Sequence, residues 1–202
     1  METEQINHFF ERLADRLKIP CEVILTGASA GRLMGHIRPS VDIDFEIRAK
    51  SKRDQPRLQA VLDGVIRKLC SELGVAANYS GDISRWGEVS YLDYRKTARP
   101  YRQFGALDVK LIHPAYWTIG KMTRYLEQDI RDMAAILKEH RIDPVPLISL
   151  WAKALRQSNL SLSLSQFKEH VEDFLKRHAR AVWGEQCRSE ELIRRFQRAL
   201  GR

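Results

Sequence analysis

Apolar side chains recur at helical spacing in two stretches of the first 75 residues. Residues 5–18 carry one apolar stripe, which Pro20 ends, and residues 57–73 carry another, which Gly74 ends. The first stripe consists of Ile6, Phe9, Phe10, Leu13 and Leu17, and the second of Leu58, Val61, Leu62, Val65, Ile66, Leu69, Cys70 and Leu73. Each stretch predicts an amphipathic helix that buries one face.

A second pattern, typical of strands, lies between these helices. The apolar segment CEVILTG ends at Gly27 as a buried strand would, and the following SAGRLMGH predicts a helix that begins near Ser29. In VDIDFEI, apolar and acidic residues alternate with the two-residue period of a strand. Its apolar face holds Val41, Ile43, Phe45 and Ile47, and its acidic face holds Asp42, Asp44 and Glu46. Further strands are predicted for residues 75–80, 88–94 and 104–112.

From Pro114 onward the chain predicts helices, with breaks near Asp143-Pro144, in the segment SNLSLSLS and at Gly184. The order of elements is then helix, strand, helix, strand, helix, several strands and several helices. This order indicates an α/β or α+β sheet domain capped by a helical tail. We place a sheet domain in residues 1–140 and a helical C-terminal extension in residues 141–202.

The composition matches a soluble globular protein, with 44% hydrophobic and 30% charged residues. No apolar run reaches the roughly 18 residues that span a bilayer, and the first residues do not resemble a secretory signal. We therefore expect a cytoplasmic protein without a membrane partner. The 3 cysteines are far apart and suggest neither a disulfide framework nor a zinc pair.

The net charge of +8 favours a polyanionic partner. Residues 141–202 hold 12 basic and 7 acidic side chains, so the extension is the more basic part. Residues 84–105 interleave arginines and Lys96 with Trp86 and three tyrosines, which suits stacking on RNA or on a nucleotide base. The same pattern is also typical of a twisted hairpin with a wet basic side.

Residues 27–47 hold the main candidate chemistry. Asp42 and Asp44 share one face of a strand, where like charges repel unless a cation lies between them. Oxygen ligands favour Mg²⁺ or Mn²⁺. The turn before them supplies the complementary half, because small Gly27 and Ala28 let the backbone approach a phosphate and Ser29 offers a hydroxyl. A wet acidic strand face is the structural alternative, but the order and spacing of turn and aspartates favour a site.

This arrangement resembles the signature of the nucleotidyltransferase superfamily. That signature has two parts, which a spacer separates. The first part is a hydrophobic residue, Gly and a small residue. The second part is Asp, a hydrophobic residue, Asp or Glu, and another hydrophobic residue. Residues 25–29 match its first part and residues 42–45 its second, with Ala28 where Gly or Ser is commoner. More narrowly, the chain is similar to minimal bacterial nucleotidyltransferases of the DUF6036 and AbiEii-like toxin types. The resemblance covers residues 22–137 and implies a polymerase-beta-like mixed sheet flanked by helices.

The resemblance also implies further site residues. Arg38 and Ser40 match an Arg and a Ser or Thr that precede the aspartates in these relatives. A later Lys-x-x-Arg followed by aspartates is matched by Lys121, Arg124, Asp129 and Asp132. A third carboxylate from a later strand would complete the metal cluster or act as a base. Asp108 is our preferred candidate for it, and Asp93 and Asp82 remain open.

If residues 117–137 form one helix, its polar and apolar stripes separate. Lys121, Gln128 and Asp132 then lie within about 20° of one direction, and Arg124 about 60° to one side. The apolar stripe consists of Ile119, Met122, Leu126, Ile130, Met133 and Leu137. Lys121 and Arg124 are thus expected to face phosphates, with Asp129 placed to orient Lys121. An ordinary charged helix surface is the structural alternative.

These features predict a magnesium-dependent nucleotidyltransferase that takes a nucleoside triphosphate with Mg²⁺ or Mn²⁺. It would transfer the nucleoside monophosphate to a hydroxyl of RNA, with tRNA as one candidate, or of a protein. The resemblance adds the hypothesis of a toxin with a cognate antitoxin. The alternative is a catalytically inactive nucleotide- or RNA-binding module of the same fold, because the third carboxylate is uncertain.

Overall fold

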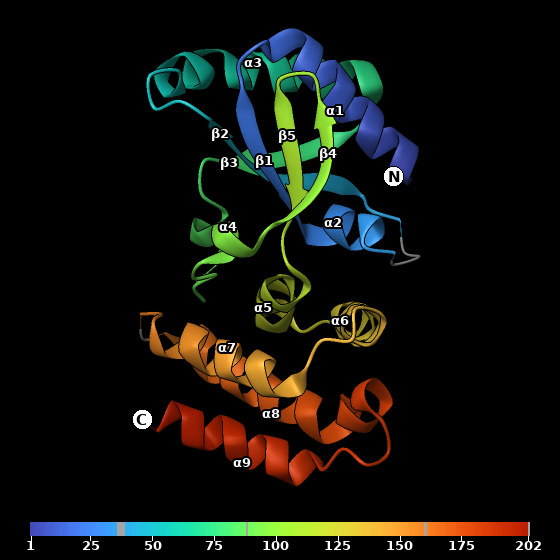
Figure 1. Cartoon of the computed structure of the whole chain (residues 1–202), viewed down its shortest axis with the longest axis vertical. Helices are drawn as coiled ribbons and strands as arrows, with labels where there is room; N and C mark the ends of the chain where they lie inside the picture. The colour runs from blue at the N-terminus through green and yellow to red at the C-terminus, as the bar shows by residue number, and fades with distance from the viewer. Residues whose placement is uncertain (36–38, 88, 160, 202) are drawn as a thin grey trace. The chain divides into compact units, whose positions relative to one another are not determined.

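The computed structural model describes residues 1–35, 39–87, 89–159 and 161–201 (Figure 1). The chain divides into two compact units. Unit 1 comprises Met1–Ile83 and Arg95–Ile112, and unit 2 comprises Ser84–Tyr94 and His113–Arg202. The boundary that the sequence predicts near residue 140 falls inside unit 2, between α6 (Glu127–Glu139) and α7 (Pro144–Arg156).

Unit 1 is built, in its described residues, on a five-stranded mixed sheet with the order β3-β2-β1-β5-β4. The strands are β1 (Cys21–Thr26), β2 (Asp42–Ala49), β3 (Ala76–Ser80), β4 (Arg99–Phe104) and β5 (Leu107–Leu111). β1 runs antiparallel to β2 and parallel to β5, while β3 is parallel to β2 and β4 antiparallel to β5. The predicted class, a mixed sheet flanked by helices, is confirmed.

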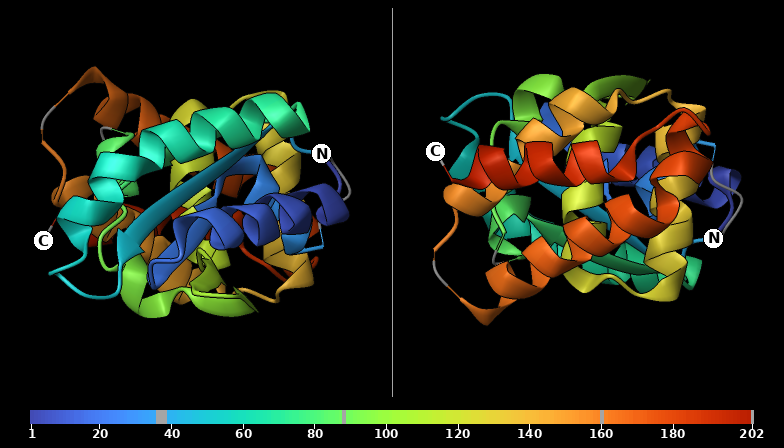
Figure 2. Two further views of the ribbon diagram at one scale, coloured as in Figure 1. Left: turned by 90° about the horizontal axis from the view of Figure 1, so that it is seen from above. Right: turned by 90° about the horizontal axis from the view of Figure 1, so that it is seen from below.

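Helices α1 (Thr3–Leu17) and α3 (Gln55–Leu73) lie side by side over one face of this sheet (Figure 2, left). Phe9 and Phe10 of α1 contact Phe45 of β2, with ring centroids 6.0 and 5.5 Å apart. The alternation in β2 therefore buries its apolar side chains under the helices and turns Asp42 and Asp44 to the opposite face. Val41 departs from the prediction, because it precedes the strand and is 86% exposed.

The three strands predicted after residue 75 have different outcomes. β3 confirms the strand at residues 75–80, and β5 lies within the predicted residues 104–112. The chain turns at Gly105, which has φ +49, so β4 and β5 form a hairpin whose first strand was missed. The strand predicted for residues 88–94 is wrong for the described residues 89–94, because Leu92 has φ +54 and cannot continue an extended backbone.

Three short elements lie in the connections between the strands, and two of them extend into Ser84–Tyr94 of unit 2. Helix α2 (Gly27–Leu33) joins β1 to the segment before β2, and it starts two residues earlier than predicted. A 3₁₀ turn, η1 (Ile83–Arg85), and the one-turn helix α4 (Tyr94–Thr97) lie between β3 and β4.

Unit 2 packs α5 (Pro114–Arg124), α6, α7, α8 (Leu162–Trp183) and α9 (Ser189–Leu200) around fully buried aromatic side chains. Trp151 is among them, and its indole Nε1 donates to Thr118 Oγ1 at 2.9 Å. The helix breaks predicted at residues 143–144, in SNLSLSLS and at Gly184 are confirmed. The single helix expected over residues 117–137 is wrong, because Tyr125 adopts a left-handed conformation with φ +51 and ends α5.

None of the helices in the described ranges has the length and apolarity needed to cross a membrane.

Candidate functional site

Asp42 and Asp44, here called the aspartate pair, project from the face of β2 opposite to α1 and α3. Both carboxylates are half-buried, whereas Ile43 and Phe45 beside them are fully buried on the helix-covered face. The strand period thus places the two carboxylates together as expected and leaves them accessible to solutes.

Asn78 completes this arrangement and was missed in the sequence. It lies on β3, whose parallel register sets Asn78 opposite Asp44. Its side-chain Nδ2 donates to Asp42 Oδ2 at 3.0 Å and to Asp44 Oδ1 at 2.9 Å. No local motif marks a lone Asn in the segment AANYS, so the pairing of β2 with β3 was needed to find it. The structure therefore makes the site a triad of two carboxylates and one amide.

The turn at Gly27 lies directly against Asp44. Gly27 has φ +62, and a Cβ built on it would stand 1.9 Å from Asp44 Oδ2, closer than any real contact. Ser29 is fully buried, and its hydroxyl donates to Thr26 O at 3.1 Å and accepts from Asp44 N at 3.4 Å. Ala28 is half-buried. The turn thus positions Asp44 through the backbone of Gly27 and the hydroxyl of Ser29. Beside Asp44 the turn presents main chain and the methyl group of Ala28.

The structure describes one of the two predicted site residues that lie just before the aspartates. Ser40 is buried, and its hydroxyl donates to the carbonyl oxygen of Asp42, so it fixes the start of β2. Arg38 lies outside the described residues.

Asp108 lies on the same face of the sheet but is not brought to the pair. In the strand registers Asp108 is opposite Glu22 of β1, whereas Asp44 is opposite Thr26. Glu22 and Thr26 are four residues apart, which is about 13 Å along a strand. Asp108 instead forms an ion pair with Lys50, with 3.3 Å between Oδ2 and Nζ. This register makes Asp108 a poor third ligand for a metal held by the aspartate pair.

The other candidates for the third carboxylate have separate surroundings. If the pairing of β1 with β5 is continued to Thr26, the residue opposite Thr26 is Ile112, which is apolar and fully buried. Asp82 pairs with Arg95 at 3.2 Å, and Asp93 belongs to unit 2. Within the described residues, no group of three His, Cys, Asp or Glu side chains is placed to hold a metal ion.

Lys121, Arg124, Asp129 and Asp132 do come together, inside unit 2, and we call them the Lys121 cluster. Lys121 is 4% exposed, and its Nζ donates to Asp129 Oδ1 at 2.8 Å and to Asp132 Oδ2 at 2.9 Å. The same Nζ lies 5.0 Å from the ring centroid of Trp117. Lys121 therefore compensates two buried carboxylates and joins α5 to α6, instead of facing outward as the single-helix geometry predicted.

Arg124 closes the cluster toward the surface. Its guanidinium donates to Asp129 through Nε at 2.9 Å and Nη2 at 2.7 Å, and its side chain is 61% exposed. Burial by itself would raise the pKa of Asp129, but hydrogen bonds from Arg124 and Lys121 outweigh it, so that the pKa is lowered. A carboxyl group with a lowered pKa stabilises the folded state at neutral pH, and this contribution is lost as the pH falls through the lowered pKa.

The aromatic and basic stretch of residues 84–105 is used only in part inside the protein. Tyr94 is buried, and Arg95 makes two hydrogen bonds to the buried carboxylate of Glu46, at 2.6 and 3.1 Å. The Tyr101 hydroxyl donates to Asn7. Among the described residues, the exposed aromatic and basic side chains of the stretch are Trp86, Lys96, Arg99 and Arg102. The stacking surface for RNA therefore stays a prediction.

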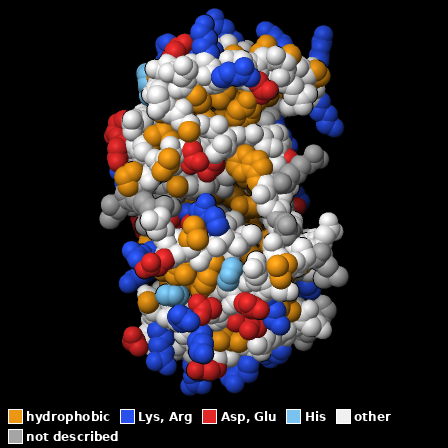
Figure 3. Space-filling view, turned by 180° about the vertical axis from the view of Figure 1, so that it is seen from behind, with side chains coloured by type: hydrophobic (Ala, Val, Ile, Leu, Met, Phe, Trp, Pro, Cys, Tyr) orange, Lys and Arg blue, Asp and Glu red, His pale blue; other side chains and the backbone are white. Residues whose placement is uncertain are grey.

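Helix α9 carries three of the 12 basic side chains of the extension. Arg194 and Arg198 are exposed and Arg195 is half-buried, and within the described ranges these three side chains form no ion pair. Arg195 and Arg198 border a hollow of about 260 Å³ with Ser149 and Ala199. Figure 3 shows, over its lower part, Lys and Arg side chains mixed with Asp and Glu. The α9 arginines are available to a polyanion, although the surface is not uniformly basic.

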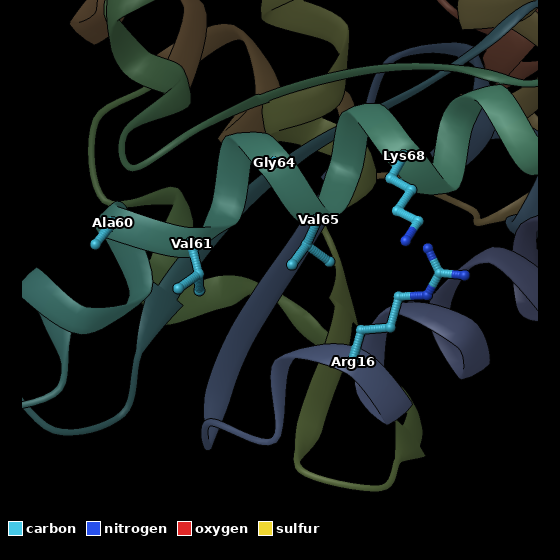
Figure 4. A pocket seen from close by; sticks show the side chains of 6 residues that line it. All are labelled: Arg16, Ala60, Val61, Gly64, Val65 and Lys68. Carbon is cyan, nitrogen blue, oxygen red and sulfur yellow. The ribbon is translucent and has the colours of Figure 1, made fainter.

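A larger hollow, of about 560 Å³, lies over α1 and α3 (Figure 4). Ala60, Val61, Gly64 and Val65 of α3 line it, together with the cationic Arg16 and Lys68. It belongs to the helices that cover the apolar face of the sheet, whereas the aspartate pair projects from the other face. It is therefore separate from the candidate site.

The donor set of the aspartate pair fits a magnesium ion. Mg²⁺ is commonly held by one or two carboxylates and takes its other ligands from water and substrate phosphates. Asp42 and Asp44 supply two such carboxylates at an accessible position, and Asn78 holds them together.

Comparisons with protein-family models, with curated proteins and with solved structures find no match to this chain.

Proposed function

We propose that the protein is a magnesium-dependent nucleotidyltransferase whose site is formed by the aspartate pair and the Gly27 turn. The observation that carries the proposal is the contact between Gly27 and Asp44, which leaves no room for a side chain at position 27 unless Asp44 moves. A glycine turn packed against one carboxylate of the pair leaves room for the backbone to approach a metal-bound triphosphate.

Each residue of unit 1 has a role in this proposal. Asp42 and Asp44 would hold Mg²⁺, which when bound neutralises phosphate charge and polarises the reacting phosphoryl group. Gly27 and Ala28 would let the triphosphate approach the pair, and Ser29 and Ser40 would keep β2 in place through the bonds described above. Asn78 would keep the two carboxylates at a fixed separation.

The reaction is the transfer of a nucleoside monophosphate to an acceptor hydroxyl. The acceptor oxygen bonds to the α-phosphorus, the bond from the α-phosphorus to the bridging oxygen breaks, and pyrophosphate leaves with the electron pair. The proton of the acceptor hydroxyl passes to water, since Asp108 lies about 13 Å along the sheet from the level of the pair. RNA is the acceptor we favour because of the α9 arginines, and a protein hydroxyl is the other. A role as a toxin with an antitoxin rests on the sequence resemblance.

A second function is favoured by one specific observation. The third member of the triad is the neutral Asn78, which cannot accept a proton as a carboxylate base does. This favours a module of the same fold that binds a nucleotide without turnover.

Label transfer separates the two functions. The full-length protein is incubated with Mg²⁺ and each α-³²P-labelled nucleoside triphosphate, with total RNA or with cell protein. An enzyme yields a labelled macromolecule and an equal amount of pyrophosphate, and both are lost in Asp42→Ala/Asp44→Ala. Binding of a triphosphate without release of pyrophosphate would identify the binding module, and the absence of both would overturn the proposal.

A further inference from the structure

The amide of Asn78 stands between two carboxylates and bonds to both. The distances from Nδ2, 3.0 Å to Asp42 and 2.9 Å to Asp44, are those of normal hydrogen bonds. An amide nitrogen carries two hydrogens, so one can go to each carboxylate. Because carboxylate oxygens accept and do not donate, the network itself fixes which end of the amide faces them.

The backbone around Asn78 keeps this amide in place. β3 is an edge strand and pairs with β2 alone in the described sheet, in a register that sets Asn78 opposite Asp44. The next residue, Tyr79, anchors β3 from the other face. Its ring stacks on Phe45 with centroids 5.9 Å apart, and its hydroxyl donates to Asp63 Oδ1 of α3 at 2.6 Å. The backbone of Asn78 is therefore held by the sheet and, through Tyr79, by the core, while its short and exposed side chain has few rotamers.

The Asn78 amide is uncharged, whereas the group between the two carboxylates of the Lys121 cluster is a cation. There, an ammonium group between two carboxylates brings a positive charge. The Asn78 amide satisfies one oxygen of each carboxylate but adds no charge. A divalent ion matches the charge of two carboxylates, whereas two-ion sites need further anionic ligands to hold a second ion.

We propose that Asn78 is a positioning residue of the metal site, which holds Asp42 and Asp44 at the spacing of a single divalent ion and, being neutral, limits the site to that one ion. The inference rests on the proposed function in that it assumes the aspartate pair binds the metal. The inference adds the number of metal ions that the site binds. It attributes this number to Asn78, which lies outside the Asp42–Asp44 motif.

Three single substitutions in the full-length chain test the inference, with Mn²⁺ as the probe. Mn²⁺ binding is measured by isothermal titration calorimetry and by electron paramagnetic resonance. The wild type is expected to bind one ion. Asn78→Ala should bind it about 10- to 100-fold more weakly, as is usual when a group that orients metal ligands is lost. Asn78→Asp should bind a second ion, seen as a coupled Mn²⁺ pair. Asn159→Asp, the same charge change at an exposed loop position, should behave as the wild type.

The outcomes distinguish this inference from the proposed function. If the wild type binds one ion that Asp42→Ala/Asp44→Ala abolishes, but Asn78→Ala binds within twofold of wild type, Asn78 does not position the site and the metal assignment stands. Two ions in the wild type, or one ion in folded Asn78→Asp, would overturn the limit to one ion. If neither the wild type nor Asn78→Asp binds Mn²⁺, the metal site fails and this inference fails with it. Circular dichroism of each variant establishes that it is folded.

Discussion

The aspartate pair of unit 1 and the Lys121 cluster of unit 2 each bring two carboxylates together, but with different groups between them. In the Lys121 cluster the group is a buried ammonium that donates to Asp129 and Asp132, and Arg124 adds a second cation at Asp129. In the aspartate pair it is the neutral amide of Asn78, at a position that solvent reaches.

Under our proposal, this difference separates a structural site from a metal-binding site. A buried carboxylate pair bonded to cations of the protein has little need of a solute. An accessible carboxylate pair bridged by an amide offers oxygen ligands to a divalent cation. Two aspartates close in sequence therefore do not indicate a metal site by themselves. The groups that the fold places beside them must also be known.

The largest effect is expected for Lys121→Met. This substitution keeps most of the side-chain volume but removes the ammonium that two buried carboxylates share, and losing one partner of a buried ion pair costs about 3–5 kcal/mol. Urea unfolding should show this loss, whereas Lys138→Ala, on the exposed side of α6, should change stability by less than about 0.5 kcal/mol. A stable Lys121→Met protein that binds triphosphate poorly would instead support the phosphate contact predicted from the sequence.

Asp42→Ala/Asp44→Ala should show the opposite behaviour. We expect nucleotide transfer to fall by more than about 100-fold, since even indirect metal partners are commonly worth 10- to 100-fold. Stability should change by less than about 1 kcal/mol, because both carboxylates are half-buried and removing them also removes repulsion between like charges. Label transfer and thermal unfolding measure the two quantities. Retained transfer in the folded double variant would exclude the pair as the metal site.

Gly27→Ala tests the contact between the turn and the pair. A methyl group there would stand 1.9 Å from Asp44 Oδ2, and a non-glycine residue at φ +62 adds about 1–2 kcal/mol of backbone strain. Asp44 must move, so we expect Mn²⁺ affinity to fall about tenfold as well. Gly81→Ala is the matched control in unit 1, because its added Cβ would meet nothing within 4 Å. Equal Mn²⁺ affinities in both variants would contradict the role of the turn.

The smallest effect on stability is expected for the three α9 arginines, which form no ion pair with the residues that the structure describes. Replacing Arg194, Arg195 and Arg198 of α9 with Gln should change stability by less than about 0.5 kcal/mol. The affinity for RNA should fall, and the slope of log affinity against log salt should become shallower by up to about two to three, if each arginine contacts one phosphate. The control replaces exposed Arg53, Arg57 and Arg67 of unit 1. An unchanged salt slope for the α9 variant would favour a protein acceptor.

Local sequence patterns were sufficient for α1, α3, β1 and β2 of unit 1 and for the helix limits at Pro144 and Gly184 in unit 2. The two-residue period of β2 placed Asp42 and Asp44 on one face, because side-chain direction in a strand depends only on position along the chain. Pro144 and Gly184 marked helix limits because their backbone preferences are local. The failures at Leu92 and Tyr125 arose where residues with ordinary propensities adopt positive φ, which no local pattern announced.

The composition of the site was decided by tertiary structure. Asn78 joins the aspartates through the pairing of β2 with β3, across 34 residues from Asp44, and Asp108 is kept from them by its register against β1. Lys121 is turned inward because the chain reverses at Tyr125 and brings α6 against α5. Strand register and helix packing are set by contacts between distant segments, so the sequence by itself determined which residues could carry charge at the site and the fold determined which of them meet.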